Sequence, residues 1–98
     1  MDARERRALA ALAQKLEANV SVGKSGVTPG VLAELEARLS RSELVKVRFL
    51  KSAREGAQRQ ELADSLATGA RAEVVEVRGN TVVLWRAKSK RGPGANVK

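Results

Sequence analysis

The spacing of hydrophobic residues along this chain changes several times between a helical period and a strict alternation. A helical period over residues 3–17 predicts an amphipathic helix, and a second predicts a helix that begins at Thr28-Pro29 and runs to about Ser40. A third helix is predicted over residues 55–68, with Gly69 at its C-terminal stop position. The apolar faces of the three helices are formed, in order, by Leu9, Leu12, Ala13 and Leu16, by Val31, Leu32, Leu35 and Leu39, and by Leu62, Ala63, Leu66 and Ala67.

Alternating hydrophobic residues predict four strands, at Val20-Ser21-Val22 and at residues 43–50, 72–78 and 81–87. The last two strands flank Gly79-Asn80, a two-residue loop suited to a tight hairpin. This loop sets a register in which the core face pairs Val77 with Val82, Val75 with Leu84 and Glu73 with Arg86. The other face then carries Lys46, Arg48, Val74, Arg78, Val83 and Trp85. This second face is too apolar to leave bare, so we expect either the first helix or a nucleic acid to cover part of it.

The predicted order of elements is helix, strand, helix, strand, helix, strand, strand. A strand-helix-strand crossover makes its two strands parallel, whereas a hairpin makes its two strands antiparallel. The fold class is therefore α/β, with a mixed four-stranded sheet and three helices in one domain over residues 1–87. Residues 88–98 are predicted to be a basic flexible tail, because they contain too few apolar side chains to pack.

Charge narrows the choice of partners. The 98 residues include 19 Lys and Arg against 11 Asp and Glu, which gives a formal charge of +8. Residues 1–40 account for +1 of this charge and residues 41–98 for +7. A field of this sign and size favours a polyanion, and nucleic acid in particular.

The residue types that are missing exclude several kinds of chemistry. The chain contains neither Cys nor His, so disulfides, imidazole or thiolate metal sites and nucleophile–histidine pairs cannot form. The segment Gly23-Lys24-Ser25 is not a P-loop, which requires glycine where this chain has Ala18. We therefore expect a monomeric, cytoplasmic binding protein with no membrane span, catalytic residues, metal or cofactor.

The loop Gly23-Lys24-Ser25-Gly26 is the strongest candidate for a binding site. It connects a short strand to a helix whose first N–H groups carry partial positive charge, and glycine allows the backbone to approach a ligand closely. Lys24 adds a cation and Ser25 a hydroxyl group, so the loop could hold a phosphate without reading a base. The alternative is a tight turn with solvated side chains.

Four segments, taken together with their order and spacing, resemble the YhbY-like proteins of the CRM family (chloroplast RNA splicing and ribosome maturation). Two departures from the family pattern are Ala70, where a second glycine is common after Thr-Gly, and Trp85, where tyrosine is common. The four segments are Val20 to Val31, Glu43 to Val47, Ala67 to Ala70 and Val77 to Arg86.

This resemblance implies a fold like the C-terminal domain of translation initiation factor three, RNA binding through the Gly-x-x-Gly loop, and association with precursors of the large ribosomal subunit. Arg86 could instead pair with Glu73, and Trp85 could either stack on a base or pack under the first helix. The alternative function is that of an adaptor that docks on ribosomal proteins or other acidic partners. The residues predicted to bind RNA are Gly23, Lys24, Ser25, Gly26, Lys46, Arg48, Arg78 and Arg86.

Overall fold

A computed structural model describes residues 2–56 and 58–87; the predicted tail lies outside the described residues. Its four strands form one mixed sheet in the order β1-β2-β4-β3, in which β1 and β2 are parallel and the other neighbours are antiparallel. The strands are β1 (Val20–Val22), β2 (Leu44–Phe49), β3 (Glu73–Arg78) and β4 (Thr81–Trp85). The helices are α1 (Ala3–Ala13), α2 (Pro29–Arg41), α3 (Lys51–Gly56) and α4 (Arg59–Ala70). The predicted fold class is confirmed.

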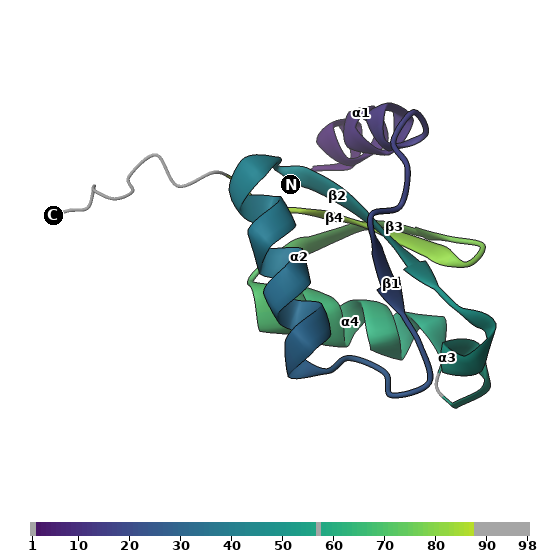
Figure 1. Cartoon of the computed structure of the whole chain (residues 1–98). Coiled ribbons are helices and arrows are strands. Elements are labelled where there is room, and N and C mark those ends of the chain that lie inside the picture. The colour runs from purple at the N-terminus through teal and green to yellow at the C-terminus, as the bar shows by residue number, and fades with distance from the viewer. Residues whose placement is uncertain (1, 57, 88–98) are drawn as a thin grey trace, which may run out of the picture.

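One face of the sheet carries the main core. Helices α2 and α4 pack against this face (Figure 1), and the short helix α3 contributes Ala53. Leu35, Leu39 and Leu66 from the helices meet Val47 and Phe49 from β2, and these five side chains are at most 1% exposed. Hydrophobic burial on this face therefore fixes the sheet against both long helices.

The second face of the sheet is only partly covered, by α1. Ala13 is buried there against Val75 and Val83, and the partly buried Leu9 packs beside them. The Arg6 guanidinium donates a hydrogen bond to the main-chain carbonyl of Val74, which ties α1 to β3. A smaller apolar cluster thus holds α1 over the part of the sheet that contains Trp85, and the partly buried Trp85 packs against this cluster.

The predicted first helix was too long, and part of its apolar stripe does not pack. Helix α1 ends at Ala13, four residues before the expected Glu17. Leu12 is 57% exposed and Leu16 is 38% exposed, so neither lies over the sheet as expected. Leu9 and Ala13 of the predicted stripe do pack against the sheet, and Ala10 joins them.

Residues 51–70 form two helices where the sequence predicted one. The segment that starts at Lys51 is helical, and α4 follows from Arg59. Gly69 lies inside α4 and does not end it; the left-handed cap is Arg71, with φ of 57°. A Cβ atom on Gly69 would lie 2.7 Å from the Cδ2 atom of Leu32, so this glycine allows α4 to pack closely against α2.

A β-bulge in β3 changes the predicted hairpin register. Beside the loop, Val77 pairs with Val82 as expected. An irregularity between Val74 and Glu76 then shifts the register, so that Val74 opposes Leu84 where Val75 was predicted. Val74 therefore packs toward the main core and Val75 toward α1, which exchanges their predicted faces.

Candidate nucleic-acid interface

The Gly-x-x-Gly segment forms a tight turn between β1 and α2. The N–H of Gly26 donates to the carbonyl of Gly23 at 2.9 Å, and the two central residues, Lys24 and Ser25, are exposed. Gly26 has a φ of 73°, a left-handed conformation that favours glycine, whereas Gly23 does not have a positive φ. Only one of the two glycines is thus required by the backbone, and the turn projects Lys24 and Ser25 into solvent.

The start of α2 offers fewer free N–H groups than the sequence suggested. Thr28 is the N-cap, and its Oγ1 accepts a hydrogen bond from Val31 N–H at 3.2 Å. Pro29, at the first helical position, has no N–H. In the first three positions of α2, this leaves the amide of Gly30 as the group that could donate to an anion. The side chains of the turn therefore have to supply most of the attraction.

The start of α3 lies beside this turn. Leu50 N–H donates to the carbonyl of Val22 at 2.9 Å, which extends the parallel pairing beyond the strands. A Cβ atom on Gly23 would lie 3.6 Å from the Cδ1 atom of Leu50 and 4.0 Å from the Oγ atom of Ser52. The exposed Lys51, between those two residues, is therefore brought to the same end of the sheet as Lys24.

A polar row crosses all four strands at this end of the second face. Ser21 on β1 pairs with Arg48 on β2, Arg48 pairs with Thr81 on β4, and Thr81 pairs with Arg78 on β3. Ser21, Arg48 and Arg78 are exposed, and Thr81 is half-buried. Because neighbouring strands lie about 4.8 Å apart, the row extends over roughly 14 Å.

The tip of the hairpin belongs to the same end. The carbonyl of Asn80 accepts from Phe49 N–H at 2.7 Å, and its side-chain Oδ1 accepts from the Arg59 guanidinium at 3.2 Å. The first residue of α4 is thereby placed against the β3–β4 loop. Arg59 remains exposed while it makes this hydrogen bond.

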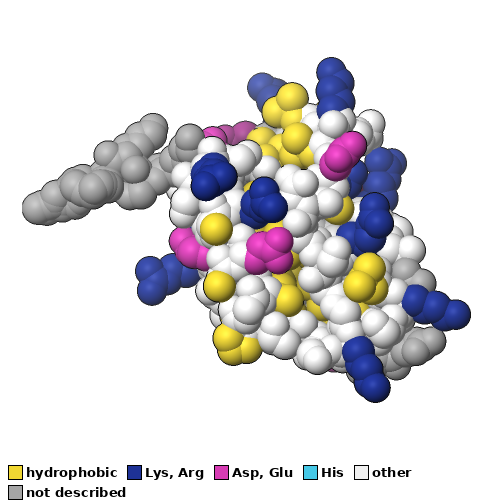
Figure 2. All heavy atoms as spheres, viewed as in Figure 1, with side chains coloured by type: hydrophobic (Ala, Val, Ile, Leu, Met, Phe, Trp, Pro, Cys, Tyr) yellow, Lys and Arg dark blue, Asp and Glu magenta, His cyan; other side chains and the backbone are white. Residues whose placement is uncertain are grey.

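Five exposed cations from five parts of the chain thus gather at one end of the sheet, and we call them the cationic edge: Lys24, Arg48, Lys51, Arg59 and Arg78. In Figure 2, Lys and Arg side chains are spread along the side of the molecule that carries β1, the following turn and α3. Sequence reasoning missed Lys51 and Arg59. The signal for Lys51 was available, since parallel strands end at the same edge and residues that follow them become neighbours.

Lys46 lies nearer to the covered part of the second face than the rest of the predicted site. It is half-buried, its strand partner on β4 is Val83, and its Nζ atom donates to the carbonyl of Leu16 at 3.4 Å. The N–H of Asn19 also donates to the Lys46 carbonyl at 3.2 Å. Lys46 therefore helps to hold the segment between α1 and β1, and it borders the cationic edge from the α1 side.

Arg86 is not brought to the cationic edge. It follows β4 at the opposite end of the sheet, where its guanidinium forms two hydrogen bonds of 2.8 Å with the Glu36 carboxylate and one of 2.9 Å with the Ala70 carbonyl. This hydrogen-bonded pair lowers the pKa of Glu36 below its usual 4.5 and raises the pKa of Arg86. Arg86 therefore links β4 to α2 and α4, and an RNA contact by this residue stays a prediction.

The described part of the chain offers neither a cluster of metal ligands nor a membrane-spanning helix. In residues 2–56 and 58–87, no three His, Cys, Asp or Glu side chains are grouped so that they could hold a metal ion. Within the same part of the chain, none of the helices is long and apolar enough to span a membrane.

Comparison with known proteins identifies the family. Residues 1–86 match the CRS1/YhbY (CRM) domain, so the chain belongs to this family. It is 31% identical to Probable RNA-binding protein YqeI of Bacillus subtilis over 83 residues, which cover 85% of this chain and 84% of YqeI. It is 33% identical to an RNA-binding protein of Haemophilus influenzae over 86 residues, which cover 88% of this chain and 85% of the relative.

The fold is also similar to a solved structure. The solution structure of the hypothetical protein SAV1595 from Staphylococcus aureus, a candidate RNA-binding protein, superposes with a TM-score of 0.79. The two chains are 25% identical, and the similarity covers 92% of each. The resemblance to the CRM family and its mixed α/β fold is thereby confirmed.

The Glu36–Arg86 pair predicts a specific dependence of stability on pH. Because folding lowers the pKa of Glu36, its contribution is present above pH 4.5 and is lost as the pH falls through the folded-state pKa. Glu36→Gln should lower the free energy of unfolding at pH 7 by up to about 1 kcal/mol, since the carboxylate is 53% exposed. The difference from the parent should shrink below pH 4.5, as measured by urea unfolding at several pH values.

Glu34→Gln provides the matched control. Glu34 lies on the same helix and contacts Arg38 at 4.0 Å, without the paired hydrogen bonds that Glu36 makes. The control variant should differ less from the parent at pH 7. A Glu36→Gln variant whose deficit stays constant down to pH 2.5 would contradict a structural role for the ionised pair.

Proposed function

We propose that this chain binds RNA through the cationic edge, with the Gly23–Gly26 turn as its central contact. The observation that carries the proposal is that the fold brings five exposed cations from separate segments to one end of the sheet. Membership of the CRM family and the names of its relatives as RNA-binding proteins support a nucleic-acid partner. The formal charge of +8 also attracts a polyanion such as RNA over longer distances.

The cationic edge is suited to contacts with the RNA backbone. Lys24 and Ser25 extend from the turn as a cation and a hydroxyl donor, both of which bind phosphate oxygens. Arg48 and Arg78 add two guanidinium groups to a row across the sheet, and the hydroxyl groups of Ser21 and Thr81 lie in the same row. Such a row contacts the phosphates of one strand, so we propose a preference for unpaired or irregular RNA over a plain duplex.

The proposed RNA is ribosomal RNA in precursors of the large ribosomal subunit. This part of the proposal is supported by the resemblance of the Gly-x-x-Gly and hairpin segments to the YhbY-like proteins. The protein would act as an assembly or maturation factor that holds a segment of ribosomal RNA. This role requires only binding, in keeping with the sequence-based expectation that the chain is not an enzyme.

Charge reversal in the turn should separate a specific contact from the general field of the protein. Lys24→Glu places a carboxylate where a phosphate would bind, and the loss should be roughly 1.5–3 kcal/mol, or about ten- to hundredfold in affinity. Arg41→Glu is the matched control, because it makes the same change in net charge at the exposed far end of α2. Fluorescence anisotropy with one ribosomal RNA fragment at fixed salt would measure both affinities.

Melting curves should show that both variants remain folded, since exposed substitutions usually change stability by about 0.5 kcal/mol or less. A larger loss of RNA affinity for Lys24→Glu than for Arg41→Glu would show a specific contact at the turn. If Lys24→Glu and Arg41→Glu lose the same affinity, the turn makes no contact of its own, and only the mean field of the protein attracts RNA.

The affinity should also depend steeply on salt. If the five cations of the cationic edge each neutralise one phosphate of a single strand, log affinity should fall against log salt with a slope of about −3.5. Arg48→Gln should make this slope shallower by about 0.7, because one fewer counterion is released. Titrations at several salt concentrations between about 50 and 300 mM would measure the slopes of the parent and the variant. An unchanged slope for the variant would exclude Arg48 from the interface.

The identity of the RNA can be tested separately. Ultraviolet crosslinking in cells, followed by sequencing of the bound RNA, should recover segments of large-subunit ribosomal RNA, and Lys24→Glu should reduce that signal. Crosslinks concentrated in messenger or transfer RNA would reject the ribosomal part of the proposal and leave RNA binding itself intact.

A further inference from the structure

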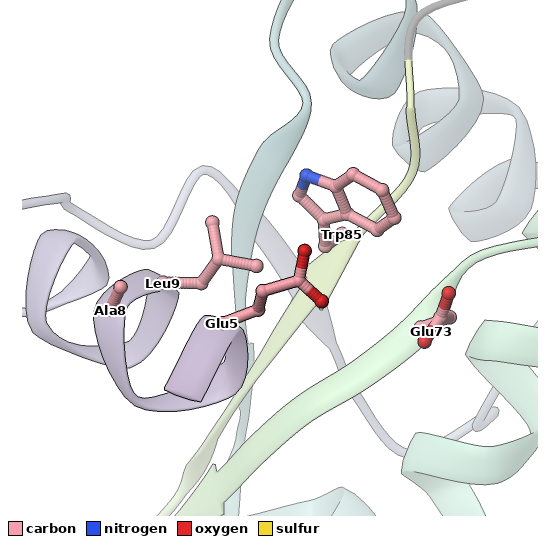
Figure 3. Close-up of a pocket in the computed structure, with 5 residues that line it drawn as sticks. All are labelled: Glu5, Ala8, Leu9, Glu73 and Trp85. Atoms are coloured by element: carbon pink, nitrogen blue, oxygen red, sulfur yellow. The ribbon is translucent and has the colours of Figure 1, made fainter. Parts of the chain in front are cut away.

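The surface around Trp85 combines apolar side chains with carboxylates. Two adjoining hollows of about 420 and 530 Å³ share Leu9 and Trp85, and we call them together the Trp85 groove. Figure 3 shows the first hollow, where Glu5 and Leu9 project from α1 beside the Trp85 indole and Glu73 lies on β3. The second hollow is lined by Leu9, Leu12, Arg41, Ser42, Glu43, Leu44 and Trp85.

The groove exists because α1 packs through its small residues. Ala10 and Ala13 lie against the sheet, so Leu12, on another side of the helix, is left 57% exposed at the rim of the groove. Trp85 and Leu44 are only half-buried. Figure 2 shows hydrophobic side chains gathered over α1 at this end of the molecule. A partner that covers exposed apolar area of this kind lowers the free energy of the complex, because the area is removed from water.

The charge of the groove selects the kind of partner. Glu5, Glu43 and Glu73 line it against one cation, Arg41, in a protein whose formal charge is +8. Glu43 and Glu73 also interact within the fold. This local reversal of sign disfavours RNA and anionic lipid and is complementary to a basic partner. The Trp85 indole can also attract an arginine or lysine side chain through a cation–π contact.

We propose that the Trp85 groove binds a basic amphipathic segment of a protein partner. Aliphatic side chains of this segment would cover Leu9 and Leu12, and an arginine or lysine would lie over the Trp85 indole near Glu5. The groove and the cationic edge are at opposite ends of the second face, because Leu44 pairs with Trp85 at one end of β2 and Arg48 pairs with Thr81 at the other. The partner and RNA could therefore be bound together, which goes beyond the proposed RNA binding.

The single tryptophan of the chain gives a direct readout. The probe is a synthetic amphipathic peptide of Leu, Ala and Arg without aromatic residues, titrated into the full chain in the absence of RNA. We expect a saturable change in Trp85 fluorescence, and the peptide affinity obtained from it should weaken with added salt. A peptide in which every Arg is replaced by Glu should cause no saturable change, because the groove is acidic.

A matched pair of leucine variants locates the binding. Leu12→Gln removes an exposed leucine from the groove and should weaken peptide binding about five- to tenfold, through the lost burial of part of one side chain. Leu50→Gln makes the same change on a leucine that is 41% exposed beside the Gly23–Gly26 turn, and it should leave peptide affinity unchanged. RNA affinity measured on Leu12→Gln should equal that of the parent, so the two proposals can fail separately.

Three results would overturn the proposal. The first is no saturable fluorescence change with the basic peptide. The second is equal binding of the basic and acidic peptides, which would show that charge does not select the occupant. The third is concentration-dependent dimerisation in sedimentation equilibrium that Leu12→Gln abolishes, which would assign the groove to a second copy of this chain.

Discussion

The parallel pairing of β1 with β2 is the constraint on which the arrangement of the cationic edge depends. Val20 lies opposite Val47 and Val22 opposite Phe49, and these four side chains are at most 1% exposed. Because α2 crosses from the end of one strand to the start of the other, both strands end at the same edge of the sheet. The Gly23–Gly26 turn and the start of α3 are neighbours for this reason, and a change in this pairing would separate their cations.

Helix α1 divides the second face of the sheet into two regions with different chemistry. It covers Val75, Val83 and part of Trp85, and it leaves the row from Ser21 to Arg78 open. The β-bulge in β3 contributes to this division, because it turns Val75 toward α1. One end of the face thus offers cations and hydroxyl groups, and the other offers an indole, aliphatic side chains and carboxylates.

Basic residues occupy two different environments in this fold. The Glu36–Arg86 pair joins α2 to the end of β4, and the same guanidinium satisfies the Ala70 carbonyl at the end of α4. Arg86 thereby anchors the two core helices at the end of the sheet away from the cationic edge. Lys24 and Arg48, in contrast, are exposed and remain accessible to a ligand. A basic residue in the sequence is therefore not by itself a sign of a binding site, since tertiary contacts decide which role it takes.

Elements whose signals are local could be predicted from the sequence. Alternation identified the strands, Thr28-Pro29 marked the start of α2, and Gly79-Asn80 marked the hairpin, because each depends on backbone preferences within a few residues. The folded structure was needed to reveal the bulge in β3, the side of α1 that packs, and the partner of Arg86. It was also needed to bring Arg59 to the end of the sheet where Lys24 lies. These features depend on contacts between segments distant in the chain, where packing of whole layers outweighs local preference.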